Sequence, residues 1–190
     1  MIQNESLILE KLLAFRNEMR DKAAHGGDWE DFTLRVFRFQ AECNVPFGKF
    51  IQLRGVDPNE VRSMEHIPFL PVEFFQTHRI SVFPAALPNE KVFLSSGTSG
   101  QLRSRHIVDD STWYDDMAVK GFDSTSGPLE GTVFFGLLPG YLERGQSSLV
   151  HMVRNFMVRT GAKEPEQQFF MNDYSGLEAA LTELNDGANE

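Results

Sequence analysis

The sequence predicts an α/β fold, in which a mostly parallel β-sheet is flanked by helices and preceded by an N-terminal helical segment. Amphipathic-helix and buried-strand patterns alternate along the chain, as they do in α/β folds. The stretch Thr132–Leu138 is an apolar run typical of a strand that is buried on both faces. A chain of 190 residues with 41% hydrophobic residues can also build one substantial core.

The N-terminal third predicts helices. Residues 6–24 carry apolar residues at steps of three and four, which defines one helix face. Asp28 predicts the N-cap of a second helix, whose apolar stripe ends at Cys43. A thiol on such a face is interpreted as buried and inert rather than as a nucleophile. We therefore expect residues 1–64 to be mainly helical and residues 65–190 to form the α/β part of a single domain or fragment.

The middle of the chain gives weaker signals. Asp57-Pro58 resembles a helix start, with the proline at the first helical position. Four prolines then divide residues 68–88 into short pieces, and the phenylalanines among them favour core packing. His66 and His78 have no partner at metal-ligand spacing, so we predict no metal site there.

Beyond residue 90 the expected elements follow in quick succession. Residues 92–95 predict a strand and residues 104–109 the returning strand, and a helix capped near Asp110 runs to about residue 121. Pro139-Gly140 ends the strand Thr132–Leu138. The next helix opens at residues 145–148 and is expected to turn one apolar face inward, made of Leu149, Met152, Val153 and Phe156. A capping box at Ser175–Glu178 predicts the last helix.

The loop after the first strand is the strongest candidate binding segment. Two glycines and four hydroxyl residues fall within six positions, Ser95, Ser96, Gly97, Thr98, Ser99 and Gly100. Such a loop can turn its amides and hydroxyls toward an anion. Arg103, Arg105 and His106 follow and can supply positive charge. A polar hairpin turn is the alternative interpretation. The loop is neither the GxxxxGK[ST] phosphate motif nor GxGxxG.

Composition restricts the function classes. The formal net charge is −9 and the isoelectric point is near 5.1, which argues against broad nucleic-acid binding. A single cysteine fits a reducing cytoplasm and excludes an intrachain disulfide. No signal peptide or membrane-spanning run is evident, so we expect a cytoplasmic protein.

Three ordered segments resemble one known family. The loop 95–100 resembles the phosphate loop of AMP-forming adenylating enzymes, and its continuation Arg103-Ser104-Arg105-His106 resembles the LuxE-type acyl-protein synthetases, which are related to phenylacetate-CoA ligases. The stretches Ile67–His78 and Leu138–Leu149 resemble the same branch. Two positions depart from the pattern, because Leu102-Arg103 replaces the common Pro-Lys and Ser99 replaces a threonine.

The resemblance implies the N-terminal part of an adenylate-forming ligase with ATP and Mg²⁺ as cofactors. Such an enzyme activates a fatty carboxylic acid to an acyl-adenylate and transfers the acyl group to a thiol, either CoA or an enzyme cysteine that serves an acyl reductase. Residues 95–100 would contact the phosphates, and Arg103 or Arg105 would offset charge as catalytic residues. His106 either joins them in catalysis or instead caps a strand or packs at its end. The acyl or adenylate pocket would be lined by Tyr141, Gly145, Gln146, Ser147 and Ser148.

Two features of that family are missing. We find no downstream adenine- and magnesium-binding motif, and Cys43 lies far upstream of where the family carries its acceptor cysteine. The chain is therefore expected to be an N-terminal domain or a fragment, which alone binds nucleotide weakly and catalyses nothing. The alternatives are a non-catalytic or degenerate nucleotide- or anion-binding module and a fragment of an acyl-CoA ligase. A serine hydrolase is disfavoured, because no Gly-x-Ser-x-Gly elbow is present.

Overall fold

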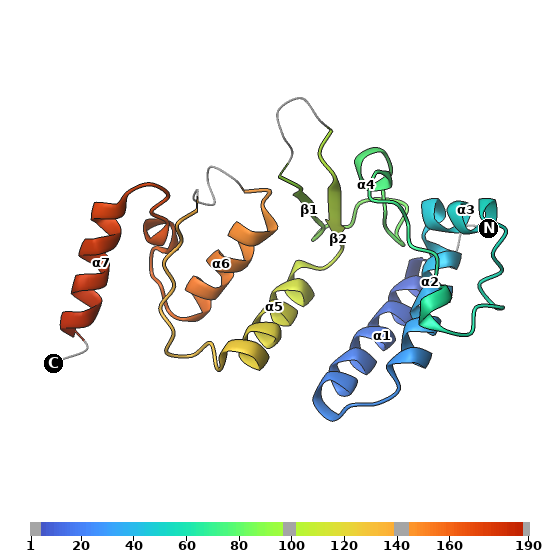
Figure 1. Ribbon diagram of the computed structural model, residues 1–190, viewed down its shortest axis with the longest axis horizontal. Helices are drawn as coiled ribbons and strands as arrows, with labels where there is room; N and C mark the ends of the chain where they lie inside the picture. The colour runs from blue at the N-terminus through green and yellow to red at the C-terminus, as the bar shows by residue number, and fades with distance from the viewer. Residues whose placement is uncertain (1–4, 97–101, 139–144, 188–190) are drawn as a thin grey trace. The chain divides into compact units, whose positions relative to one another are not determined.

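Helices dominate the structure. The computed structural model describes residues 5–96, 102–138 and 145–187 (Figure 1). By its internal contacts the chain divides into two compact units. The first unit comprises residues 1–90 and 97–109, and the second comprises residues 91–96 and 110–190.

The first unit is built from helices and one strand, α1 (Glu5–His25), α2 (Trp29–Cys43), α3 (Val45–Leu53), the short 3₁₀ helix η1 (Met64–His66), α4 (Phe74–Thr77) and β2 (Arg105–Val108). The two predicted N-terminal helices are confirmed. The side chain of Asp28 caps α2 by accepting a hydrogen bond from the amide of Asp31 at 3.0 Å. The predicted helix start at Asp57 is wrong, because Asp57 caps a tight turn instead, with its carbonyl accepting from the amide of Glu60.

Two hydrophobic clusters form the core of the first unit. One gathers residues of α1 and α2 with Val82 and Phe83, and it includes Cys43. The other joins α2 and α3 through Leu34, Phe37, Ile51 and Val61. Burial raises the pKa of the Cys43 thiol, which agrees with the predicted inert role because a neutral thiol is a poor nucleophile.

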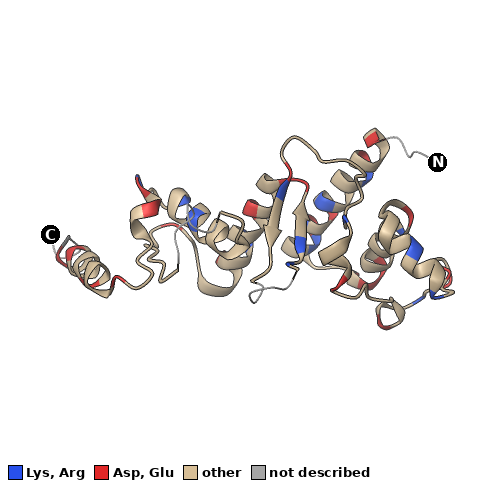
Figure 2. Ribbon diagram, turned by 90° about the horizontal axis from the view of Figure 1, so that it is seen from above, with Lys and Arg blue, Asp and Glu red and all other residues tan. Residues whose placement is uncertain are grey.

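Ion pairs fix loops of the first unit, one to helix α1 and one to another loop. Arg16 of α1 donates to Asp109, the residue after β2, at 2.8 Å, and the Arg16 side chain is only 10% exposed. Arg79 donates to Glu90 at 2.8 Å and lowers the pKa of that carboxyl. Figure 2 shows that residues of both charges are spread along the chain rather than separated by sign.

The second unit contains β1 (Lys91–Leu94), α5 (Ser111–Ser126), α6 (Ser148–Arg159), the 3₁₀ helix η2 (Pro165–Gln168) and α7 (Tyr174–Gly187). Asp110 caps α5 as predicted, because its side chain accepts from the amides of Thr112 and Trp113. The capping box predicted at Ser175 is wrong, because the helix begins two residues earlier. Asp173 accepts from the amide of Gly176 at 2.9 Å and so begins α7.

Aromatic packing fills the core of the second unit. Phe122 of α5, Phe134 and Phe156 of α6 lie with ring centroids 5.3–5.4 Å apart. Met157 is completely buried beside them on α6. This cluster stabilises the α5–α6 pair, because such aromatic side chains bury large apolar areas and also gain from ring–ring contact.

The predicted mostly parallel sheet is wrong. The described residues form one sheet of two antiparallel strands, β1 and β2. Only ten residues connect these strands, whereas a parallel connection needs a dozen or more. The stretch Thr132–Leu138 makes one isolated parallel bridge, in which Gly136 exchanges 2.8 Å hydrogen bonds with Gln168 and Phe170. Phe134 of this stretch packs against Phe122 and Phe156 of the helices α5 and α6, whereas Val133 and Leu137 are exposed.

None of the described helices is long and apolar enough to cross a membrane. This finding agrees with the expectation from the sequence that the chain contains no membrane span.

Gly48 provides a test of the α2–α3 packing. A Cβ atom at this position would lie 2.5 Å from the carbonyl oxygen of Ala41, and backbone cannot yield cheaply. We expect Gly48→Ala to lower the free energy of unfolding by about 1–3 kcal/mol in urea denaturation followed by circular dichroism. Gly121→Ala is the control, since that helical position is open and should gain up to about 1 kcal/mol. Equal stability of the two variants would contradict the packing.

Candidate functional site at the entrance of helix α6

Two segments that carried the predicted site meet in the second unit. The amide of Leu94, the last residue of β1, donates to the carbonyl of Gln146 at 2.9 Å. The start of the predicted phosphate loop therefore lies beside the turn that precedes α6. We call residues 94–96 and 145–148 the α6 entrance.

The α6 entrance presents neutral hydrogen-bond donors. Ser147 caps α6, with its hydroxyl accepting from the amide of Val150 at 3.4 Å and its carbonyl accepting from the amide of His151 at 3.0 Å. Gly145, Gln146 and Ser148 are exposed. The first turn of a helix carries amides without intrahelical acceptors and a partial positive charge, so this end of α6 favours an anion.

A buried polar cluster lies one turn into α6. His151 is 7% exposed, and its Nε2 lies 2.8 Å from Oδ1 of Asp115 on α5. Its Nδ1 lies 3.3 Å from Nζ of Lys91, the first residue of β1. The rings of Phe93 and Tyr114 lie 5.3 and 6.0 Å from the imidazole ring. We call these five residues the His151 cluster, and it joins β1, α5 and α6.

Tyr114 links this cluster to the α6 entrance. Its hydroxyl forms a hydrogen bond with Ser148, the first residue of α6. Burial is the main influence on this phenol and raises its pKa above the ordinary value. Tyr114 therefore stays neutral in the folded chain well beyond neutral pH and holds Ser148 through an uncharged contact.

The apolar face predicted for α6 is confirmed at Phe156 and wrong at Leu149. Val150, His151, Phe156 and Met157 are the buried residues of this helix, whereas Leu149 is 48% exposed. The sequence analysis consequently missed His151. A signal was available, because Val150, Val153 and Met157 also recur at steps of three and four and place His151 beside that stripe.

The predicted cationic residues belong to the first unit. Arg103 and the β2 residues Arg105 and His106 are exposed. The ring of His106 stacks on Phe75 with centroids 5.1 Å apart and planes at 26°, so this histidine packs against the end of α4. That Arg103, Arg105 and His106 act on one ligand together with the loop 95–100 stays a prediction.

The other predicted positions divide in two groups. Ser95 is half-buried and Ser96 exposed at the α6 entrance. The remaining predicted positions lie outside the described residues, namely Gly97, Thr98, Ser99, Gly100 and Tyr141.

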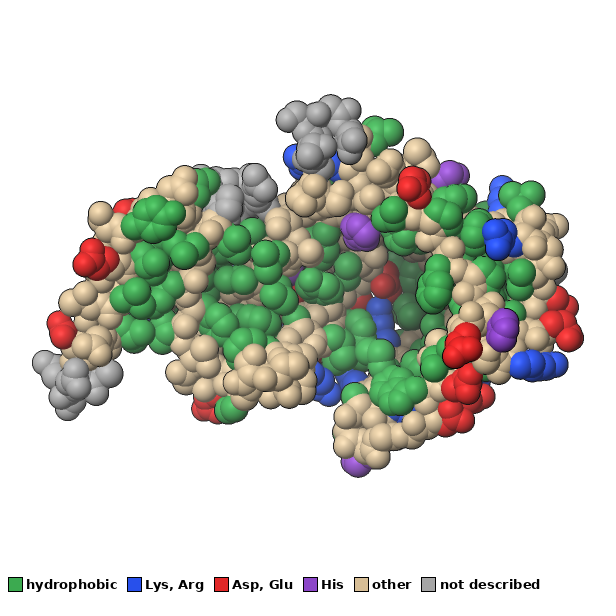
Figure 3. Space-filling view, in the orientation of Figure 1, with side chains coloured by type: hydrophobic (Ala, Val, Ile, Leu, Met, Phe, Trp, Pro, Cys, Tyr) green, Lys and Arg blue, Asp and Glu red, His purple; other side chains and the backbone are tan. Residues whose placement is uncertain are grey.

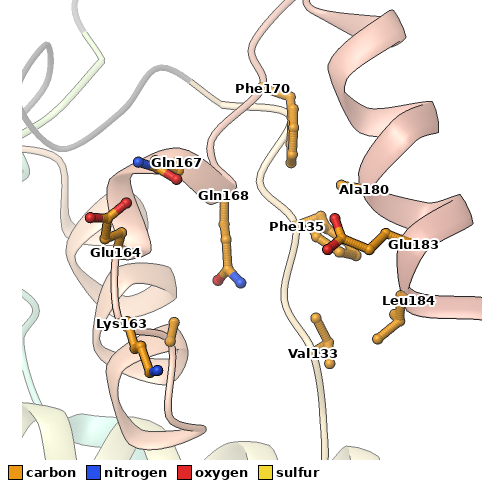
Figure 4. Close-up of a pocket in the computed structure, with 11 residues that line it drawn as sticks. Val133, Phe135, Lys163, Glu164, Gln167, Gln168, Phe170, Ala180, Glu183 and Leu184 are labelled. Atoms are coloured by element: carbon orange, nitrogen blue, oxygen red, sulfur yellow. The ribbon is translucent and has the colours of Figure 1, made fainter. Parts of the chain in front are cut away.

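The second unit also contains a cavity of about 880 Å³ that the sequence analysis did not predict. Val133 and Phe135 line one wall, and Ala180 and Leu184 of α7 line another (Figure 4). Gln168 projects into it from η2, opposite α7. Hydrophobic side chains gather on this part of the surface, where Val133 and Leu184 are 44% and 43% exposed (Figure 3).

The alternating directions of side chains along residues 133–135 explain the cavity. Phe134 points toward α5 and α6, so its neighbours Val133 and Phe135 point to the opposite side. The volume lies in the range of small-molecule sites, and the walls combine apolar side chains with a few polar groups such as Lys163 and Glu183. The cavity can therefore accept an apolar or amphipathic ligand.

No cluster of three or more histidine, cysteine, aspartate or glutamate side chains suited to a metal ion occurs among residues 5–96, 102–138 and 145–187. No protein-family model, curated protein or solved structure matches this chain. The proposed relationship to acyl-protein synthetases thus depends on the three motifs alone.

The raised pKa of Tyr114 predicts a pH dependence. In the unfolded chain the phenol of Tyr114 ionises at about pH 10, whereas in the folded chain it ionises at higher pH. The stabilisation from the neutral phenol is therefore complete below about pH 10 and is lost as the pH rises through the folded value. Between about pH 9 and 11 we expect the free energy of unfolding to fall more for the wild type than for Tyr114→Phe. Parallel curves for the two proteins would contradict this interpretation.

Proposed function

We propose that the α6 entrance binds the phosphates of ATP, and that the chain is part of an AMP-forming ligase that activates a carboxylic acid. The observation that supports this proposal is the hydrogen bond between Leu94 and Gln146. It joins the first residues of the serine-glycine loop to the Leu138–Leu149 segment, which are two of the three stretches on which the family resemblance depends.

The chemistry of the α6 entrance suits a phosphate. The hydroxyls of Ser95, Ser96 and Ser148 can donate hydrogen bonds, and the described residues of the entrance include no carboxylate that would repel an anion. The first-turn amides of α6 add donors at the positive end of the helix dipole. When bound with ATP, Mg²⁺ would neutralise part of the phosphate charge, and we assign no residue of this chain as its ligand.

The cavity of the second unit provides space for an acyl chain. Val133 and Phe135 line it, and Leu138 precedes Gly145 of the α6 entrance by seven residues in the sequence. An alkyl chain would gain from leaving water for these apolar walls, at about 25 cal/mol for each Å² buried. The carboxyl group of such an acid is the group that must reach the α-phosphate.

The proposed reaction has two steps. A carboxylate oxygen attacks the α-phosphate, which forms an acyl-adenylate and releases pyrophosphate. The sulfur of an acceptor thiol then attacks the acyl carbon, and AMP leaves. Cys43 is unsuited as acceptor because it is buried and its thiol pKa is raised, so the acceptor is CoA or a cysteine elsewhere. The family resemblance assigns Arg103 or Arg105, whose side chains are exposed, the role of offsetting phosphate charge.

A negative charge at the α6 entrance tests the phosphate site. We expect Ser148→Glu to weaken binding of Mg·ATP at least about tenfold in calorimetric titration, because the carboxylate repels phosphate and competes for the helix end. Ser175→Glu is the matched control, an exposed serine in the first turn of α7, and should bind like the wild type. Thermal melting of both variants checks folding. Equal affinities for ATP would remove the α6 entrance from the proposal.

The loop itself separates the ligase from a binding module. Replacing Thr98 and Ser99 together by alanine should reduce ATP–pyrophosphate exchange that depends on a long-chain fatty acid. The exchange is measured on the longest protein that contains this sequence. Loss to below about one hundredth is expected if the loop stabilises the departing pyrophosphate. ATP binding without carboxylate-dependent exchange in the wild type would favour the non-catalytic module instead. Unchanged exchange in the double variant would make the phosphate-loop assignment wrong.

A further inference from the structure

His151 is contacted on both of its ring nitrogens by charged groups from other elements. Nε2 lies 2.8 Å from the carboxylate of Asp115, and Nδ1 lies 3.3 Å from the ammonium nitrogen of Lys91. The imidazole is 7% exposed, so water competes little for either contact. The Asp115 side chain is 19% exposed.

These partners determine where the ring proton lies. A lysine ammonium has three donors and no acceptor, so Nδ1 of His151 must accept with its lone pair. A carboxylate only accepts, so Nε2 must carry the hydrogen and donate it to Asp115. The geometry is satisfied by one form alone, the neutral imidazole with its hydrogen on Nε2.

We infer that His151 is a positioning residue. As a neutral imidazole with its hydrogen on Nε2, it holds the first turn of α6 against β1 and α5. Protonation of its Nδ1 releases Lys91. Lys91 is three residues before Leu94, and His151 is five residues after Gln146. The side-chain bridge and the backbone hydrogen bond of Leu94 to Gln146 therefore join the same two segments and stabilise each other.

Acidification acts on one side of the ring. The titratable groups that contact the imidazole include Lys91 of β1 and Asp115 and Tyr114 of α5. At the start of α6, the carbonyl of Ser147 accepts a hydrogen bond from the backbone amide of His151. A second proton on the ring leaves the bond to Asp115 in place. It directs an Nδ1 hydrogen at the ammonium group and sets two positive charges within hydrogen-bond distance, which repel each other.

The consequence for the protein is a loosened α6 entrance in acid. That this would weaken ATP binding depends on the proposed function. The coupling between His151 and the Leu94 amide does not depend on it, because both belong to the fold of the second unit.

His151→Gln is the informative variant. The glutamine carbonyl oxygen can accept from Lys91 and its amide nitrogen can donate to Asp115, but the side chain does not titrate. Hydrogen exchange of the Leu94 amide, corrected for intrinsic rates, is measured at about pH 8 and about pH 5.5. We expect the wild type to lose protection about tenfold in acid and His151→Gln to lose none. His25→Gln, at an exposed histidine of α1, should behave like the wild type.

Nitrogen NMR of the wild type distinguishes the proposed role from a purely structural one, because it reports which ring nitrogen of His151 carries the hydrogen. At about pH 8 we expect the Nδ1 resonance of an unprotonated nitrogen and the Nε2 resonance of a protonated one. If His151→Gln does not fold, Lys91→Met serves instead, since removal of the ammonium should abolish the acid loss of Leu94 protection. A proton on Nδ1 at about pH 8, or equal acid loss in wild type and variant, would overturn the inference.

ATP titration separates the two proposals. If ATP fails to bind at any pH while Leu94 protection still depends on His151, the proposed function fails and the positioning role stands. If ATP binds equally at about pH 8 and about pH 5.5 and Leu94 protection is constant, the positioning role fails and the phosphate site stands.

Discussion

The hydrogen bond from the Leu94 amide to the Gln146 carbonyl is the contact on which the candidate site depends. It joins residues 52 positions apart in sequence and sets the last residue of β1 next to the turn that leads into α6. Without it, the hydroxyls of Ser95 and Ser96 would have no defined relation to the positive end of α6. One such bond contributes only about 1 kcal/mol, so the junction needs further support.

The His151 cluster supplies that support with little net charge. Lys91 and Asp115 carry opposite charges on either side of the imidazole, and Phe93 and Tyr114 pack around it. Burying a lone charge is costly, whereas a paired and hydrogen-bonded group is tolerated. Because the two charges cancel when the ring is neutral, the cluster adds no field that would repel an anion at the nearby α6 entrance.

Local signals in the sequence were sufficient for the helices but not for the sheet. Asp28 and Asp110 cap helices through side chains two or three residues away from the amides they accept, so short-range patterns predicted both. The stretch Thr132–Leu138 has the composition of a buried strand, yet a strand also needs neighbours that sequence periodicity does not specify. It makes a single bridge at Gly136, and the rings of Phe122 and Phe156 cover Phe134 while Val133 and Leu137 stay exposed. The candidate site shows the same contrast between local and distant signals. Residues of the serine loop and of the turn before α6 belong to motifs that the sequence shows, whereas His151 acquires its role through Lys91 and Asp115, which are 60 and 36 residues away.

The two-sided character of the Phe134 segment connects packing with the proposed function. Phe134 packs against α5 and α6, so the α6 helix, whose first turn is the proposed phosphate site, also holds the segment that lines the cavity with Val133 and Phe135. A shift of α6 along its axis would therefore move both the anion-binding end and the apolar wall. For an enzyme that must bring a carboxyl group to an α-phosphate, a single helix that positions both binding surfaces favours correct orientation of the two reactants, which is a large part of the rate that proximity can supply.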